Sequence, residues 1–119
     1  MKENVLADKS KEFALKIIKL YRYLSDSQHE YILSKQLLRC GTSIGANAKE
    51  GAYAQTKADL ITKLFIAQKE CAETEYWLEL LLRKKKLEDK QYKELKNLCG
   101  SIRRRLIASV TTTKSKIEI

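Results

Sequence analysis

The segment "CGTSIGANAKEG", Cys40–Gly51, holds three of the four glycines in a chain of 119 residues that contains no proline. It lies between two runs with helical periodicity, so it is either a loop or a helix whose neighbours require small residues. A phosphate-binding loop would follow a strand and carry G-x-x-x-x-G-K-[ST] or G-x-G-x-x-G, and neither pattern is present. The segment is therefore read as part of a helix, with about 100° between successive residues.

This helix has a core side and a flank of small residues. Gly41 and Gly45 share the flank, and each costs about 1 kcal/mol in a helix relative to alanine. That cost predicts a neighbouring helix that approaches closely along the flank. Gly51 is expected to end the helix in a left-handed conformation. The core side is formed by Leu33, Leu37, Cys40, Ile44 and Ala48.

Polar residues occupy a second flank of the same helix. This flank is either a half-exposed boundary or a surface buried against the third helix or another subunit. If it is buried, Arg39 needs a carboxylate partner, with Glu73 and Glu75 as candidates, because an unpaired buried charge is too costly. The residues of the flank are Gln36, Arg39, Ser43, Asn47 and Glu50.

Apolar residues recur at spacings of three and four along the rest of the chain, which is typical of amphipathic helices. Ser27 with Glu30, and Thr56 with Asp59, have the spacing of helix N-terminal caps. The chain is predicted to be all-α, a single domain (1–119) that forms an antiparallel up-down-up-down four-helix bundle. The expected helices cover about 10–25, 28–51, 57–84 and 89–110, followed by a ragged tail at 111–119.

The positive charge is concentrated in the last third of the chain. Residues 1–82 carry 12 basic and 11 acidic side chains, whereas residues 83–119 carry 12 basic and 4 acidic ones. Such asymmetry favours a polyanionic partner, RNA or DNA, bound through phosphates. The alternative is that basic runs only solvate helix ends. The candidate nucleic-acid-binding residues are Arg83, Lys84, Lys85, Lys86, Arg103, Arg104 and Arg105, in two clusters expected near opposite ends of the bundle.

Other classes of function find little support. Three cysteines without a C-x-x-C pair and a single histidine, His29, predict no metal site, no cofactor and no catalytic residues. No small-molecule substrate is indicated. No apolar run approaches 18 residues, so no membrane partner is expected. Lys16, Lys19 and Arg22 interrupt the apolar patch near the N-terminus, which excludes a signal peptide and makes the cytoplasm the expected compartment.

Two quoted runs, "QLLRCGTSIGANAKEG" and "IAQKECAETEYWLEL", carry a family resemblance. They resemble the four-helix-bundle proteins encoded in intervening sequences of bacterial 23S ribosomal RNA genes, which also carry a ribosomal-protein label. The departure is Lys69–Cys71, where many members have G-S-L. The matching positions are Gln36, Arg39, Ser43, Ile44, Asn47, Glu50, Gly51, Ile66, Ala67, Glu73 and Leu78.

The resemblance implies a ring-like homopentamer. It also implies similarity to the accessory protein of diversity-generating retroelements, a basic pentamer that binds nucleic acid and a reverse transcriptase. Two hypotheses follow for this chain. One is a non-catalytic oligomer that binds RNA or DNA through basic surfaces. The other is an assembly or scaffold protein that acts through a protein partner, supported by the broad apolar surface of "ETEYWLELLL" (Glu73–Leu82).

Overall fold

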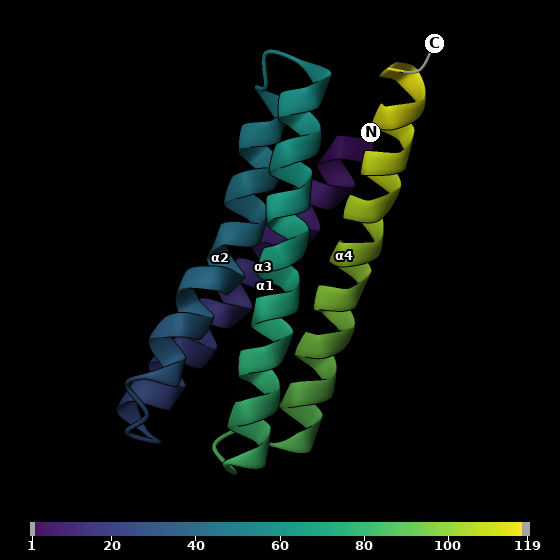
Figure 1. Cartoon of the computed structure of the whole chain (residues 1–119). Helices are drawn as coiled ribbons and strands as arrows, with labels where there is room; N and C mark the ends of the chain where they lie inside the picture. The colour runs from purple at the N-terminus through teal and green to yellow at the C-terminus, as the bar shows by residue number, and fades with distance from the viewer. Residues whose placement is uncertain (1, 118–119) are drawn as a thin grey trace.

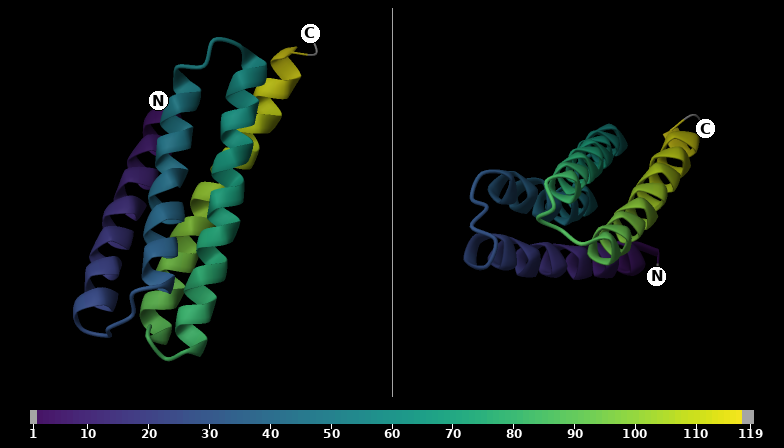
Figure 2. Two further views of the ribbon diagram at one scale, coloured as in Figure 1. Left: turned by 60° about the vertical axis from the view of Figure 1, so that its left-hand side comes forward. Right: turned by 90° about the horizontal axis from the view of Figure 1, so that it is seen from below.

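The computed structural model describes residues 2–117, with side chains from Val5 to Lys116. Its four helices are α1 (Lys2–Asp26), α2 (Leu33–Ala52), α3 (Lys57–Arg83) and α4 (Asp89–Ile117). Each helix packs against the next one in the sequence, and α1 packs against α4 to close the bundle. The helices alternate in direction, so the start of α1 and the end of α4 lie at the same end of a molecule that measures 52 × 22 × 22 Å (Figures 1 and 2). The predicted all-α, up-down-up-down bundle is confirmed.

The core is built from the apolar positions that recur at three-four spacing. All three cysteines are fully buried in it, as expected of small apolar side chains on or beside these stripes. Its largest fully buried apolar side chains are Phe13, Ile17, Leu24, Leu37, Ile44, Leu78, Leu81, Ile102 and Leu106.

The glycine flank of α2 faces α1, as the close-approach argument predicts. A Cβ atom on Gly41 would lie 2.9 Å from both Cγ atoms of Ile17, and one on Gly45 would lie 3.1 Å from the Cβ of Ser10. The expectation for Gly51 is wrong, because no glycine among residues 2–117 has a positive φ. Gly51 instead allows contact with α3, since its Cβ would lie 3.0 Å from Cδ1 of Leu60.

The start of α2 differs from the prediction. The Ser27 amide still donates to the Tyr23 carbonyl at 2.9 Å, so Ser27 closes α1 instead of capping α2. His29 then turns the chain with a φ of 53°. The Glu30 carboxylate accepts from the amides of Leu33 (3.1 Å) and Ser34 (2.7 Å), and α2 begins there, five residues later than expected. The predicted cap of α3 is confirmed, because Thr56 Oγ1 accepts from the Asp59 amide at 3.0 Å.

The outer helices are longer than expected. α1 begins at Lys2, and α4 continues through 111–117, where a ragged tail was predicted. Val110 and Thr113 remain buried on the core side of α4, which holds this segment against the bundle. The hydroxyl of Thr113 also donates to the Ser109 carbonyl at 2.7 Å, so the threonine run is accommodated inside a helix. The last two residues of the predicted tail lie outside the described residues.

Candidate nucleic-acid interface

The cluster Arg83–Lys86 forms the turn between α3 and α4. Arg83 Nε pairs with Glu79 Oε2 at 3.1 Å, and Lys86 Nζ donates to the Gln28 carbonyl at 3.2 Å. Lys84 and Lys85 are exposed, and Lys85 turns the chain with a φ of 60°. Two of the four basic side chains are thus engaged within the bundle, and two are available to a partner.

The three arginines of the second cluster point in different directions, because successive residues of a helix are about 100° apart. Arg103 turns toward α3, where its Nε lies 3.4 Å from Glu75 Oε2; both atoms are buried and neither forms a hydrogen bond. Arg104 and Arg105 are exposed. Because α4 extends to Ile117, these arginines lie near its middle. The expectation that the two clusters occupy opposite ends of the bundle is therefore wrong.

A different set of basic residues shares one side of α4. Lys93 and Arg104 are eleven residues apart, which places them within about 20° of each other around the helix, and Lys90 and Lys96 lie to either side. We call these four residues the α4 basic face. All four are exposed, and within residues 5–116 none forms an ion pair with a carboxylate. Sequence reasoning missed the three lysines, although their helical spacing to Arg104 was a usable signal.

The family-motif residues lie along the contact between α2 and α3. Arg39 pairs with Glu73, as predicted, and also lies 3.6 Å from Glu70 Oε2. Trp77 Nε1 donates to the same Glu73 carboxylate at 3.1 Å. The alternative partner Glu75 is wrong, because it faces Arg103. The Arg39 side chain is 52% exposed, so in a single chain this flank is a half-exposed boundary.

The remaining motif residues continue along α2. Ser43 Oγ donates to the Arg39 carbonyl at 2.6 Å, and Asn47 Nδ2 donates to the Ser43 carbonyl at 2.8 Å. Glu50 pairs with Lys63 of α3 at 2.7 Å, while Gln36 is exposed. Glu50 thus connects α2 to α3, whereas Ser43 and Asn47 donate to carbonyls of α2 itself, and all three roles are structural.

Apolar residues are spread around the whole circumference of α3, unlike those of an ordinary surface helix. Phe65, Ile66 and Tyr76 are 42%, 36% and 56% exposed, and we call these three residues the α3 outer face. The ammonium group of Lys114 lies 5.3 Å from the Phe65 ring centroid, within cation–π range. The outer face therefore combines exposed apolar side chains with a cation beside Phe65.

The thiols are poorly suited to nucleophilic chemistry. Burial raises the pKa of the Cys40 thiol to about 11, although the hydrogen bond from Thr74 opposes this rise. The pKa of Cys99 is also raised, by its hydrogen bond with Cys71 and by burial. Among the residues that the structure describes, no three His, Cys, Asp or Glu side chains are grouped so as to hold a metal ion. Nor does any described helix have a stretch apolar enough and long enough to span a membrane.

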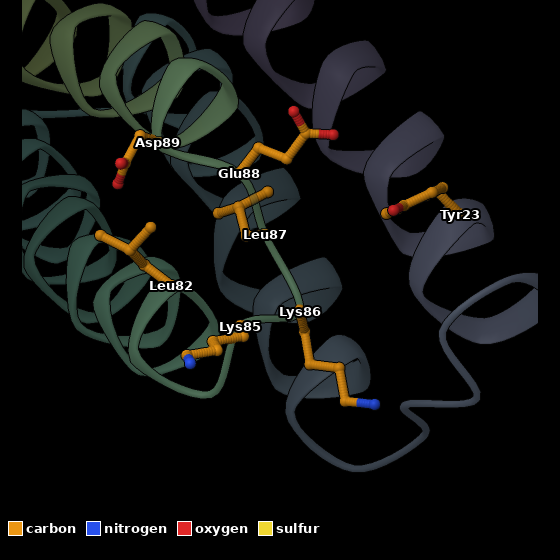
Figure 3. Close-up of a pocket in the computed structure, with 7 residues that line it drawn as sticks. All are labelled: Tyr23, Leu82, Lys85, Lys86, Leu87, Glu88 and Asp89. Carbon is orange, nitrogen blue, oxygen red and sulfur yellow. The ribbon is translucent and has the colours of Figure 1, made fainter.

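A hollow of about 490 Å³ lies at the turn between α3 and α4, beside the end of α1 (Figure 3). Its apolar lining comes from Tyr23, Leu82 and Leu87. Its charged lining comes from Lys85, Lys86, Glu88 and Asp89, so it combines two ammonium groups with two carboxylates.

Comparison with known proteins agrees with this architecture. The model of the 23S rRNA-intervening sequence protein family matches residues 2–108. The chain belongs to this family. A crystal structure of a protein of unknown function from the S23 ribosomal protein family of Bacteroides thetaiotaomicron VPI-5482 is similar to it, with a TM-score of 0.92 and 50% sequence identity, over 93% of this chain and 99% of that chain. No curated protein matches the chain. The predicted family and its four-helix fold are thus confirmed.

Proposed function

We propose that the protein is a non-catalytic, homo-oligomeric bundle of the cytoplasm that binds RNA or DNA through contacts to phosphates. The observation that carries the proposal is the α4 basic face, four exposed cations on one side of a rigid helix. An exposed cation is free to replace the counterions of a nucleic acid, whereas a cation already paired with a carboxylate must first lose its partner. Lys84 and Lys85 extend the same charge beyond the N-terminal end of α4.

Self-assembly is supported by the α3 outer face. An exposed apolar surface of this kind, bordered by polar groups, is typical of a protein–protein interface. A second copy of the chain is the occupant we propose, and the ring of five copies implied by the family resemblance remains a prediction. Repetition of the basic face in an oligomer would convert weak phosphate contacts into useful affinity. The similarity to the accessory protein of diversity-generating retroelements also remains a prediction.

A salt series of binding measurements tests phosphate recognition. Labelled RNA hairpins and duplex DNA are titrated with wild type and with a variant whose α4 basic face is changed to glutamine. We expect the slope of log affinity against log salt to fall by about 0.9 for each lost contact to duplex DNA. The matched control removes the same charge from exposed lysines of α1 and α2, namely Lys11, Lys19, Lys35 and Lys49.

Equal losses in the two variants would show that only net charge matters. Absence of binding by wild type at low salt would refute the nucleic-acid function and favour the scaffold alternative, in which a protein partner covers the α3 outer face. Assembly is measured separately by sedimentation. Tyr76→Glu should dissociate the oligomer, whereas Leu15→Glu, at an exposed apolar position of α1, should leave its mass unchanged.

A further inference from the structure

The two connectors at one end of the bundle each contain a residue in a left-handed conformation. Among residues 2–117, a positive φ occurs at His29 (53°), in the α1–α2 connector, and at Lys85 (60°), in the α3–α4 turn, and neither residue is a glycine. This region disfavours a residue that has a Cβ atom, whereas glycine adopts it freely. Residues held in such conformations concentrate at functional sites, so both side chains are candidates for a binding role. We call residues 27–32 and 84–88 the connector end.

The two connectors contact each other. Lys86 Nζ donates to the Gln28 carbonyl at 3.2 Å, and both connectors lie at the same end of the bundle (Figures 1 and 2). Tyr31 is three residues beyond Gln28, so at no more than about 3.6 Å per residue its Cα lies within about 11 Å of this contact. Lys84 and Lys85, both exposed, directly precede Lys86. The connector end therefore brings an exposed tyrosine close to exposed lysines.

Tyr31 presents an aromatic ring that is exposed and held in place. The residue is 53% exposed, and its hydroxyl lies 3.0 Å from Nδ1 of His29. The two ring planes are tilted by 51°, with 6.3 Å between the centroids, so His29 holds the hydroxyl without stacking in parallel on the phenol ring. Ile32, the next residue, is 75% exposed and extends the apolar surface. The ring can thus receive a flat partner from solvent.

The charge beside this ring is positive. Lys84 and Lys85 form no ion pair with a carboxylate within residues 5–116. Glu88 and Asp89 belong to the same turn, but Figure 3 shows their carboxylates apart from the ammonium group of Lys85. The Glu30 carboxylate of the other connector already accepts from two amides of α2. The two lysines are therefore available to a polyanion.

We propose that the connector end binds an unpaired stretch of nucleic acid, with a base stacked on Tyr31 and adjacent phosphates on Lys84 and Lys85. Stacking on an aromatic side chain accepts any base, because every base has a π face, and it is typical of single-strand binding. An acidic peptide would satisfy the lysines alone, whereas a nucleic-acid strand satisfies both the lysines and the ring. This inference rests on the proposed nucleic-acid function. The α4 basic face then binds phosphates of any strand, and the connector end adds a preference for unpaired nucleotides.

The test compares a labelled single strand of mixed sequence with the same strand annealed to its complement. Base–aromatic stacking contributes about 1–3 kcal/mol, so Tyr31→Leu should lower the affinity for the single strand by about 5- to 150-fold and leave the affinity for the duplex unchanged. The matched control is Tyr53→Leu. Tyr53 is 79% exposed in the α2–α3 connector, at the opposite end of the bundle, so its loss should change neither affinity. Equal losses in the two variants would refute the site.

Lys85→Gly separates a binding role from a structural one. Glycine is not strained at this φ, so the melting temperature measured by circular dichroism should rise. The affinity for the single strand should fall, and the slope of log affinity against log salt should decrease by about 0.7, the value for one lost phosphate contact. A variant with a higher melting temperature and an unchanged affinity would refute the role of Lys85.

The outcomes distinguish this inference from the proposed function. If wild type binds the duplex but not the single strand, the connector end does not receive unpaired nucleotides, although the proposed function stands. If it binds neither at low salt, the proposed function itself fails. Sedimentation detects a protein occupant. A lower assembly mass for Tyr31→Leu than for wild type would place the ring in an interface between copies and would overturn the inference.

Discussion

The close approach of α1 to α2 leads to opposite expectations for two glycine substitutions. In Gly41→Ala the new methyl group would lie 2.9 Å from Cγ1 and Cγ2 of Ile17 and 3.3 Å from its Cβ. Ile17 is fully buried and branched at Cβ, so it has little freedom to move away. Overpacking of a core costs about 1–3 kcal/mol, while alanine gains about 1 kcal/mol of helix propensity over glycine. The net expectation is a loss of up to about 2 kcal/mol.

Gly100→Ala is the matched control. The nearest atom to its new methyl group is Nη1 of Arg104 at 3.4 Å, which is the end of a flexible side chain. The same propensity gain then appears without the clash, and we expect stabilisation by about 0.5–1 kcal/mol. Because both variants share the propensity gain, the difference between them isolates the overpacking cost, about 1–3 kcal/mol.

Urea and thermal unfolding, both followed by circular dichroism at one protein concentration, provide the assay. A constant concentration is required because assembly contributes to the apparent stability. With an unfolding entropy of about 2.1 cal/mol/K per residue, 1 kcal/mol corresponds to about 4 °C for a chain of this length. The melting temperatures of the two variants should therefore differ by about 4–12 °C. A Gly41→Ala protein that is as stable as Gly100→Ala would refute the close approach of the two helices.

Two further predictions concern charged and titratable groups. Glu73→Gln keeps an acceptor for Trp77 but loses the ion pair with Arg39. It should lower the free energy of unfolding in urea by up to about 1 kcal/mol at low salt and by less in 1 M NaCl. A larger, salt-independent loss would show that assembly buries the pair. The buried Cys40 thiol, with its pKa raised from 9.0 to about 11, contributes stability that is complete below pH 9 and is lost as the pH rises to 11. Wild type should therefore lose about 2–3 kcal/mol more than Cys40→Ala over this interval, and equal pH profiles would contradict the raised pKa.

The helices and the core were predictable because long apolar periodicity is a strong local signal. The start of α2 was not predictable, because the signal that ends α1 and the signal that begins α2 lie within a few residues of each other. Ser27 has the right residue type and spacing for a cap, yet its amide is still needed to end α1. The actual cap is Glu30, whose carboxylate reaches two amides of α2. Both assignments fit the sequence, and only the path of the connector distinguishes them.

The partners of the site residues also depend on tertiary structure that the sequence alone does not determine. Glu73 and Glu75 were equivalent partners for Arg39 in the sequence. Because they are two positions apart, they lie about 200° apart around the helix axis, so only one of them can face α2. Which side of α3 meets α2 is a tertiary property. The basic residues were misleading for a related reason. Arg103–Arg105 are adjacent in the chain and were grouped as one cluster, but their side chains point in different directions around the helix. The α4 basic face, which includes Lys93, is recognised only when the angular positions of its residues around the helix are compared.

The distribution of ion pairs argues that the charge of α4 is more than ordinary solvation. Every glutamate of α3 pairs with an arginine: Glu70 and Glu73 pair with Arg39 of α2, Glu75 pairs with Arg103 of α4, and Glu79 pairs with Arg83 within α3 itself. Among the described residues, no carboxylate pairs with the α4 basic face. The excess positive charge in the last third of the sequence is therefore also concentrated on one side of the folded molecule. If copies meet through the α3 outer face in a closed symmetric assembly, each copy presents its α4 basic face in an equivalent position. A polyanion that spans several copies would then meet positive charge at a regular spacing.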